Sequence, residues 1–376
     1  MSTNALILSG GGARAAYQVG VLQALADILP HLHNPFPVIC GTSAGAINAL
    51  AMAAHPGEFR PAVLDLANLW QNLEFEQVFR TGWLPLSKGL FRIGRSLFNQ
   101  GVPSGKPLAL LDNSPLKDLI ERVIPFENLD LRIKAGDLKA VSVTALGYTS
   151  GQSVSFFQGG SALEGWRRSR RVGVPTQLTA DHLMASSAIP ALFPTVSIDR
   201  DYYGDGAMRQ IAPISSALHL GADRAFVIGV SSNRNPAHWG KRAITPKHSP
   251  SVAQIIGQMF NSAFIDALEG DMEHLERINH LLSLVDEDRL ESTRLRQVET
   301  LIISPSRPLD RIAGRKVRKL PSSLRFLMRS TGATIRGGGS AAASYLMFTH
   351  DYCNELMELG YQDAMWERKA IEAFFD

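Results

Sequence analysis

The chain has 376 residues, of which 45% are hydrophobic and 19% are charged, and its formal net charge is +3. This composition is typical of a globular protein with enough apolar material for one large domain or two moderate ones. The positive charge is too weak to indicate nucleic-acid binding, although it is compatible with contact with an anionic membrane.

Cysteine usage and the N-terminal segment bear on the cellular compartment. Cys40 and Cys353 cannot form a disulfide framework or a zinc site of the usual spacing. Residues 1–8 lack a basic region, and their apolar run is too short for a signal peptide. No segment approaches the roughly 18 apolar residues of a membrane span. We therefore expect a cytoplasmic protein that touches lipid only at its surface, at the inner membrane face.

The first part of the chain alternates apolar runs with helical patterns. Strands are expected at 5–9 and 38–40, and helices at 15–29 and 44–55. A glycine run follows the first strand, and the segment 41–45 makes a tight turn after the second. This order predicts an α/β domain with a mostly parallel sheet.

Residues 56–115 have a different character, because aromatic side chains are spread there among polar residues, glycines and prolines. We interpret this segment as a helical insertion packed on the core. A mobile cap over an apolar substrate site is the alternative interpretation.

The remainder of the chain carries further strands and a mainly helical end. Strands are expected at 140–146, 154–157, 224–230 and 300–304, helices at 252–282 and over most of 320–375, and a polar loop at 233–250. We therefore predict a catalytic domain over 1–232, with the insertion at about 56–115, and a mainly helical region over 233–376 packed on it.

Ser43 is the first candidate for catalysis. The pattern Gly-x-Ser-x-Gly, here Gly41, Thr42, Ser43, Ala44 and Gly45, places a serine on a sharp turn between a strand and a helix. The positive end of the following helix points at such a serine. The flanking strand and helix favour a nucleophile, while an ordinary tight turn is the alternative.

The N-terminal glycine run is a candidate anion site. Gly10, Gly11, Gly12, Ala13 and Arg14 also follow a strand and open a helix. Backbone N–H groups of such a loop can point into one concavity and hold an oxyanion, and loss of one such donor costs about 3 kcal/mol of barrier. The arginine either fixes the loop, adds positive potential or forms a salt bridge.

The same glycines allow a nucleotide-binding interpretation. Gly10-x-Gly12-x-x-Ala15 matches the relaxed dinucleotide fingerprint. That fingerprint requires an acidic residue at the end of the second strand, where this chain has Gly41 and Thr42, so the interpretation is disfavoured. A P-loop is excluded because no Gly-Lys-Ser/Thr follows the glycines.

A serine nucleophile requires a base, and no histidine after Ser43 lies in a distinctive setting. Asp205 is framed by Gly204 and Gly206 after an aromatic strand end, which suggests a constrained turn. A carboxylate whose pKa is raised by an apolar site can accept the serine proton. Taken alone, however, Asp-Gly is typical of a plain turn.

Three motifs in this order resemble the patatin-like phospholipase family. They are Gly-Gly-Gly-x-Arg at 10–14, Gly-Thr-Ser-Ala-Gly at 41–45 and Asp-Gly-Ala at 205–207. The segment 185–194 also resembles the stretch that precedes the aspartate in this family. The resemblance covers about residues 5–222, and the rest is similar to the helical extensions of bacterial members.

The resemblance implies a three-layer α/β/α fold with a mostly parallel central sheet. It implies that Ser43 is the nucleophile, that Asp205 is the base without a histidine, and that residues 10–14 form the oxyanion loop. The implied activity is calcium-independent hydrolysis of phospholipids or other acyl-ester lipids through an acyl-enzyme, with no cofactor and no metal. A transacylase or a non-catalytic, membrane-associated scaffold that binds an acyl chain is the alternative.

Apolar residues near the aspartate are candidates for the substrate pocket. Ile189, Pro190, Leu192 and Phe193 are expected to line an acyl channel together with aromatic residues of 70–98. No nucleic-acid partner is expected, and the sequence makes no prediction of the oligomeric state.

Two basic segments remain. The segment 166–171, Trp-Arg-Arg-Ser-Arg-Arg, places an aromatic residue beside four arginines, which suits lipid phosphates and an anionic interface. A solvated basic loop is the alternative. The second segment, 307–329, is interpreted as a solvated basic face.

Overall fold

The computed structural model describes residues 2–98, 107–210, 213–231, 267–286, 295–330 and 340–376, together with Ile255 and Met259. The loop predicted at 233–250, most of the predicted helix before residue 267 and the segment 331–339 lie outside the described residues.

The described strands form one sheet. They are β1 Asn4–Leu8, β2 Val38–Thr42, β3 Ala140–Gly147, β4 Ser153–Gly159, β5 Trp166–Arg168, β6 Arg171–Pro175, β7 Val196–Ile198, β8 Asp201–Asp205, β9 Arg224–Ile228 and β10 Glu299–Ile303. Their order is β10-β9-β1-β2-β3-β4-β6-β5, with β8 beside β3 and β7 beside β8. The run from β10 to β3 is parallel throughout. The predicted α/β architecture with a mostly parallel central sheet is therefore confirmed.

Helices connect and cover these strands. They are α1 Ala16–Ile28, α2 Ala44–Ala54, α3 Phe59–Gln71, α4 Phe75–Val78, α5 Trp83–Phe98, α6 Ser114–Val123, α7 Glu127–Ala135, α8 Ala180–Ser186, α9 Ser215–His219, α11 Ala267–Leu282, α13 Leu309–Lys316, α14 Ser322–Ser330, α15 Ser340–Leu346, α16 His350–Trp366 and α17 Arg368–Phe375. Short 3₁₀ turns are η1 Gly12–Ala15, η2 Gly206–Arg209 and η5 Val317–Lys319. None of the described helices is long and apolar enough to cross a bilayer.

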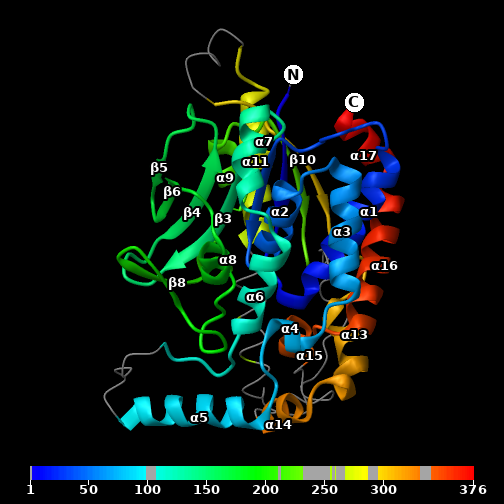
Figure 1. The fold of residues 1–376 in the computed structure, drawn as a ribbon. Coiled ribbons are helices and arrows are strands. Elements are labelled where there is room, and N and C mark those ends of the chain that lie inside the picture. The colour runs from blue at the N-terminus through cyan, green and yellow to red at the C-terminus, as the bar shows by residue number, and fades with distance from the viewer. Residues whose placement is uncertain are drawn as a thin grey trace.

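The two faces of the sheet are covered by different helices, which gives three layers (Figure 1). Leu6 and Leu8 of β1 pack in one buried cluster with α1, α2, α3 and α16. Ala5 and Ile7 belong to a second cluster with α9 and α11. This alternation follows because successive side chains of a strand point to opposite faces.

The last helices belong to the same layer as the first ones. A Cβ at Gly20 of α1 would lie 1.8 Å from the Met357 carbonyl oxygen, and one at Gly360 of α16 would lie 2.1 Å from that of Tyr17. Because both positions are glycines, the backbones of α1 and α16 can lie in contact. In addition, β10 pairs with β9 and extends the sheet at its edge. The division of the chain at residue 232 stays a prediction.

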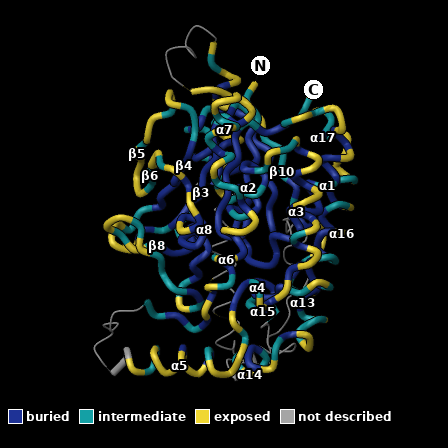
Figure 2. The backbone as a smooth tube through the Cα atoms, in the orientation of Figure 1, coloured by how far each residue is buried: buried dark blue, intermediate teal, exposed yellow. Residues whose placement is uncertain are grey.

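Residues 56–115 carry α3, α4, α5 and the start of α6. α3 packs on α1, whereas α5 lies at the lower edge of the molecule beside α14 (Figure 1). Over 83–95, most residues of α5 are exposed (Figure 2), although Leu86 and Gly89 are buried. The insertion therefore has a packed part and an exposed part.

Candidate active site

Ser43 and Asp205 meet along one edge of β3. The parallel register of β2 ends with Thr42 opposite Thr144, and the antiparallel register of β8 ends with Asp205 opposite Ala145. β4 occupies the other edge of β3, so β2 and β8 share one edge and run toward each other. The Ser43 Oγ consequently donates a hydrogen bond to Asp205 Oδ2 at 2.7 Å.

The turn at 41–45 is buried and strained. Ser43 has φ 54° and ψ −131°, a conformation that side-chain-bearing residues rarely adopt and that costs about 1–3 kcal/mol. Its carbonyl oxygen accepts the first helical bond of α2, from the Ala46 N–H at 2.9 Å. A Cβ at Gly45 would lie 2.4 Å from the Leu8 carbonyl oxygen, so a glycine there lets α2 approach the end of β1. The turn thus places Oγ at the positive end of α2.

Asp205 is completely buried. Its Oδ1 accepts the Ala207 N–H at 3.0 Å, while Oδ2 accepts the Ser43 hydroxyl. Burial raises the pKa of Asp205 to about 7, and the two hydrogen bonds act in the opposite direction. A carboxylate with a pKa near neutrality can both accept and return a proton at physiological pH.

Ser186 at the end of α8 holds the serine turn on β3. Its Oγ accepts the Ser43 N–H at 2.8 Å and donates to the Thr144 carbonyl oxygen at 2.6 Å. Ser186 lies inside the segment 185–194 that carries part of the family resemblance, but no sequence pattern distinguishes it from its neighbours. It is a positioning residue that the sequence analysis missed.

The glycine loop lies beside this pair. Gly12 begins η1 with φ 54° and lines the same cavity as Ser43. A Cβ at Gly12 would lie 2.2 Å from the Tyr345 carbonyl oxygen of α15. The first N–H groups of a helical turn have no partner inside it, so those at 11–13 suit an anion.

Arg14 does not point into the cavity but toward the C-terminal part of the chain. The buried side chain donates from Nε to Ser344 Oγ at 2.7 Å and from Nη2 to the Ala341 carbonyl oxygen at 3.5 Å. Its guanidinium carbon lies 4.0 Å from the centre of the Tyr345 ring. Three roles were considered for Arg14 from the sequence: fixing the glycine loop, adding positive potential or forming a salt bridge. These contacts match the first role, fixing the glycine loop.

The cavity beside Ser43 is small, about 50 Å³, and almost wholly apolar. Its lining residues are Gly12, Ser43, Ala44, Ile47, Leu69, Trp70, Leu73, Val78, Leu116, Leu119, Ser187, Ile189, Phe193, Tyr345 and Phe348. Of the four predicted pocket residues, Ile189 and Phe193 line it, whereas Pro190 and Leu192 do not.

Residues distant in the sequence complete the cavity. Trp70, one of the aromatic residues expected there, lines it, but Trp83 and Phe91 are exposed. Tyr345 and Phe348 come from the C-terminal region and were not expected. No local pattern connects them with Ser43, because only the packing of α15 on η1 brings them there.

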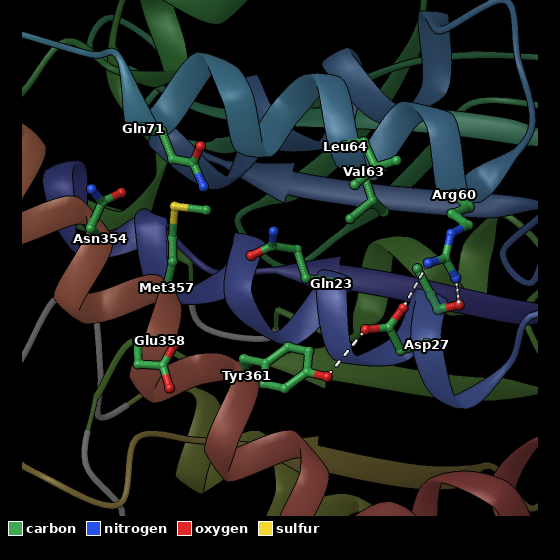
Figure 3. A pocket seen from close by; sticks show the side chains of 11 residues that line it. Gln23, Asp27, Arg60, Val63, Leu64, Gln71, Asn354, Met357, Glu358 and Tyr361 are labelled. Carbon is green, nitrogen blue, oxygen red and sulfur yellow. Dashed lines mark hydrogen bonds and ion pairs between the residues drawn. The ribbon is translucent and has the colours of Figure 1, made fainter.

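A second hollow lies between α1, α3 and α16, where polar side chains face a groove of about 580 Å³ (Figure 3). Asp27 is ion-paired with Arg60 at 3.0 Å and accepts the Tyr361 hydroxyl at 3.1 Å. None of the candidate catalytic residues lines this groove. Over the described residues, no cluster of three or more His, Cys, Asp or Glu side chains is placed to hold a metal ion.

Known proteins match the chain over the part that contains these motifs. Residues 6–218 match the sequence model of the family described as patatin-like phospholipase. A curated protein of Pseudomonas aeruginosa (strain BWHPSA011 / Pa011), the cGAMP-activated phospholipase, is 30% identical over 217 residues, which make up 57% of this chain and 55% of that protein. The chain thus spans about half the length of the curated relative it matches.

Two solved structures were also compared with the chain. VipD from Legionella pneumophila is 14% identical, with a TM-score of 0.34, and the match covers 98% of this chain and 67% of VipD. The type III effector protein ExoU is 15% identical, with a TM-score of 0.36, and the match covers 99% of this chain and 54% of ExoU.

Proposed function

The chain belongs to the patatin-like phospholipase family, and we propose that it is a serine hydrolase of lipid acyl esters. The observation that carries this proposal is the buried 2.7 Å hydrogen bond from Ser43 to Asp205 beside an apolar cavity. A hydroxyl in this setting has a base within reach and an apolar space for an acyl chain.

In the first step, ionised Asp205 accepts the Ser43 proton while Oγ attacks the ester carbonyl carbon. The negative charge that develops on the carbonyl oxygen is stabilised by N–H groups of the loop 10–13. Asp205 then returns the proton to the departing alcohol oxygen. The acyl group stays on Ser43 as an ester.

In the second step, water attacks the acyl-Ser43 carbonyl carbon as Asp205 removes a proton from it. The same N–H groups stabilise the second oxyanion. Collapse of this intermediate releases the fatty acid, and the proton on Asp205 returns to Ser43 Oγ. With a pKa near 7, Asp205 serves in both directions without a histidine.

Substrate entry requires the cavity to widen. Pockets that hold small molecules have volumes of about 300–1,000 Å³, so a cavity of about 50 Å³ is too small for a fatty acyl chain. The Phe79 ring lies 5.9 Å from that of Phe193 and 6.2 Å from that of Phe348, and these rings fill the space beside the cavity. We infer that they move when an acyl chain binds. Because the curated relative is named as cGAMP-activated, activity assays should include cGAMP as a separate condition.

We propose that α5 and α14 contact an anionic membrane. Segments 83–98 and 317–330 contain no Asp or Glu. We define the α5–α14 surface as the exposed residues Trp83, Leu84, Lys88, Leu90, Phe91, Arg92, Arg318 and Phe326. The Trp83 and Phe326 rings lie 5.5 Å apart and join the two helices. Exposed apolar side chains among cations are typical of interfacial helices.

The segments that flank α5 contact residues at or near the cavity. Upstream of α5, Phe79 contacts the rings of Phe193 and Phe348, which line the cavity. Downstream of α5, the Leu110 N–H donates to the Ala191 carbonyl oxygen at 2.9 Å, close to the same lining. The segments on both sides of α5 therefore connect this surface with the residues around the cavity.

The experiment that tests the proposed activity measures fatty acid released from a mixed phospholipid extract, with and without EDTA. We expect release by the wild-type protein under both conditions, and loss of release in Ser43→Ala and Asp205→Asn. Acyl transfer to an added alcohol would identify a transacylase. Folded protein that binds lipid without releasing or transferring any acyl group would identify a scaffold. Cell fractionation would test the proposed cytoplasmic location at the inner membrane face.

A further inference from the structure

An arginine-lined cavity lies on the face of the sheet that α9 and α11 cover. Its volume is about 870 Å³, within the range of about 300–1,000 Å³ that small-molecule sites have. Its walls come from the β5–β6 turn, α9, α11 and residues 295–298. Among the residues that line this arginine cavity are Arg168, Arg170, Arg171, His219, Asp271 and Arg296.

Three cations of one wall, Arg168, Arg170 and Arg171, form no ion pair with a described carboxylate. Asp271 is the acidic residue of the same lining, and the charge of Arg171 favours its ionised form. The segment 166–171 forms the β5–β6 hairpin, in which Arg168 pairs with Arg171. Arg168 donates only to the Arg167 carbonyl oxygen, at 3.3 Å, and no described carboxylate lies within ion-pair distance of Arg168, Arg170 or Arg171. Three arginines against one carboxylate leave this cavity with a net positive charge, which favours an anionic ligand.

A fixed, neutral ring stands beside these arginines. The His219 ring stacks on the Trp166 ring, with centres 4.7 Å apart and planes 16° from parallel. Burial and the charges of Arg168 and Arg171 lower the pKa of His219 to about 4. The ring is therefore uncharged at neutral pH, in a locally positive environment.

Two other charged residues of the cavity have structural partners. Asp271 accepts the Ile214 N–H at 3.0 Å. Arg296 is ion-paired with Asp223 at 3.3 Å and donates to the Ala222 carbonyl oxygen at 2.7 Å. The arginines of the hairpin thus remain as the cations that are open to a ligand.

We propose that the arginine cavity binds a small phosphorylated organic ligand. Guanidinium groups match phosphate oxygens with paired N–H donors. The apolar lining, which includes Leu218, Leu275, Ile278 and Val298, suits the organic part of such a ligand. This site lies on the opposite face of the sheet from the cavity beside Ser43, so it is separate from the acyl site.

Calorimetric titration of the 376-residue chain with ATP and with inorganic pyrophosphate tests this site. We expect saturable binding of at least one probe, and a tenfold or greater loss of affinity in the double variant Arg168→Gln/Arg171→Gln. The matched control is Arg167→Gln, which removes a charge from the same hairpin outside the cavity lining, and it should change affinity less than twofold. Asp271→Asn should strengthen binding, because it removes the opposing charge while its oxygen can still accept the Ile214 N–H.

A second binding experiment distinguishes a soluble phosphorylated ligand from the phosphate of a lipid headgroup. Phosphatidylcholine vesicles with and without phosphatidic acid replace the soluble probes. Binding to phosphatidic acid alone, lost in the same double variant, identifies a lipid headgroup as the phosphate source and supports the site. Absence of binding to every probe overturns the proposal. An equal loss in Arg167→Gln also overturns it, because that result indicates a general effect of surface charge.

Discussion

The guanidinium of Arg14 stacks on the Tyr345 ring, with 4.0 Å between its central carbon and the ring centre. This contact joins the N-terminal glycine loop to α15 near the other end of the chain. The Tyr345 backbone also leaves no room for a side chain at Gly12. The proposed oxyanion loop is therefore shaped by residues that lie beyond the segment matched by the family.

The pH dependence of hydrolysis should follow the ionisation of Asp205. Burial raises the pKa of Asp205 to about 7, and only the ionised carboxylate can accept the Ser43 proton. We expect kcat/KM for a soluble p-nitrophenyl ester to fall about tenfold per pH unit below that value and to level off above it. A profile that stays flat down to pH 5 would contradict this role.

Asp205→Asn should change stability with a defined sign. A carboxyl group whose pKa is raised on folding binds its proton more tightly in the folded state, so the wild-type protein loses stability as pH rises from about 4 to about 7. The asparagine of the Asp205→Asn variant does not ionise, so the variant does not lose stability over this pH range. One pKa unit corresponds to about 1.4 kcal/mol, so we expect the variant to unfold at a higher temperature than wild type at pH 8.

The comparison at low pH is the control for this prediction. Below about pH 3 the wild-type carboxyl group is protonated in both states, so the two proteins should unfold at similar temperatures. A variant that is less stable than wild type at pH 8 but equally stable at low pH would show that the ionised carboxylate stabilises the fold, which would contradict the raised pKa.

Ser186→Ala should slow the reaction without changing the groups that react. The substitution removes the acceptor of the Ser43 N–H, and an unpaired buried donor costs about 1–3 kcal/mol. We expect kcat to fall about tenfold with little change in KM, because the strained turn at Ser43 loses one of its supports. Steady-state kinetics with a soluble ester measures both constants.

Ser155→Ala is the matched control. Ser155 is a buried serine of the same sheet whose Oγ lies 2.8 Å from Ser216 Oγ and does not contact Ser43. It should lower the unfolding temperature comparably while leaving kcat near the wild-type value. Equal losses of kcat in both variants would remove Ser186 from its positioning role.

The α5–α14 surface predicts how the protein associates with vesicles. The double variant Leu84→Ser/Phe91→Ser removes two side chains that are 66% and 70% exposed. Burying such a side chain in an apolar environment contributes about 1.5–3 kcal/mol. Sedimentation with phosphatidylglycerol vesicles should therefore show at least tenfold weaker binding, while hydrolysis of a soluble ester stays unchanged.

Leu131→Ser provides the comparison for vesicle binding. Leu131 is 61% exposed on α7, far from α5 (Figure 1). Its replacement should leave vesicle binding unaltered. If it weakens binding as much as the double variant does, the contact with lipid is not specific to the α5–α14 surface.

The sequence predicted the α/β architecture and singled out Ser43 and Asp205 because their motifs are local. The strand before each residue and the glycines around it can be read from a few consecutive positions. What joins the two residues is the register of β2 and β8 on the same edge of β3. That register depends on pairings between distant segments, which no local pattern specifies.

The substrate pocket was predicted only in part for the same reason. Ile189 and Phe193 could be predicted because they lie in the segment 185–194 that resembles the family. Tyr345 and Phe348 could not, because they line the cavity only through the packing of the C-terminal helices. The basic segment 166–171 was considered for contact with an anionic membrane, yet three of its four arginines line a cavity on the face of the sheet opposite the cavity beside Ser43. Where a charged segment points depends on the hairpin it forms.

Labelling with a fluorophosphonate probe, followed by peptide mass spectrometry, tests the central role of Ser43 most directly. We predict covalent modification of the wild-type protein at Ser43, slower modification of Asp205→Asn and none at this position in Ser43→Ala, which should also release no fatty acid. Fatty-acid release by folded Ser43→Ala at the wild-type rate, or modification at a different serine alone, would contradict the account.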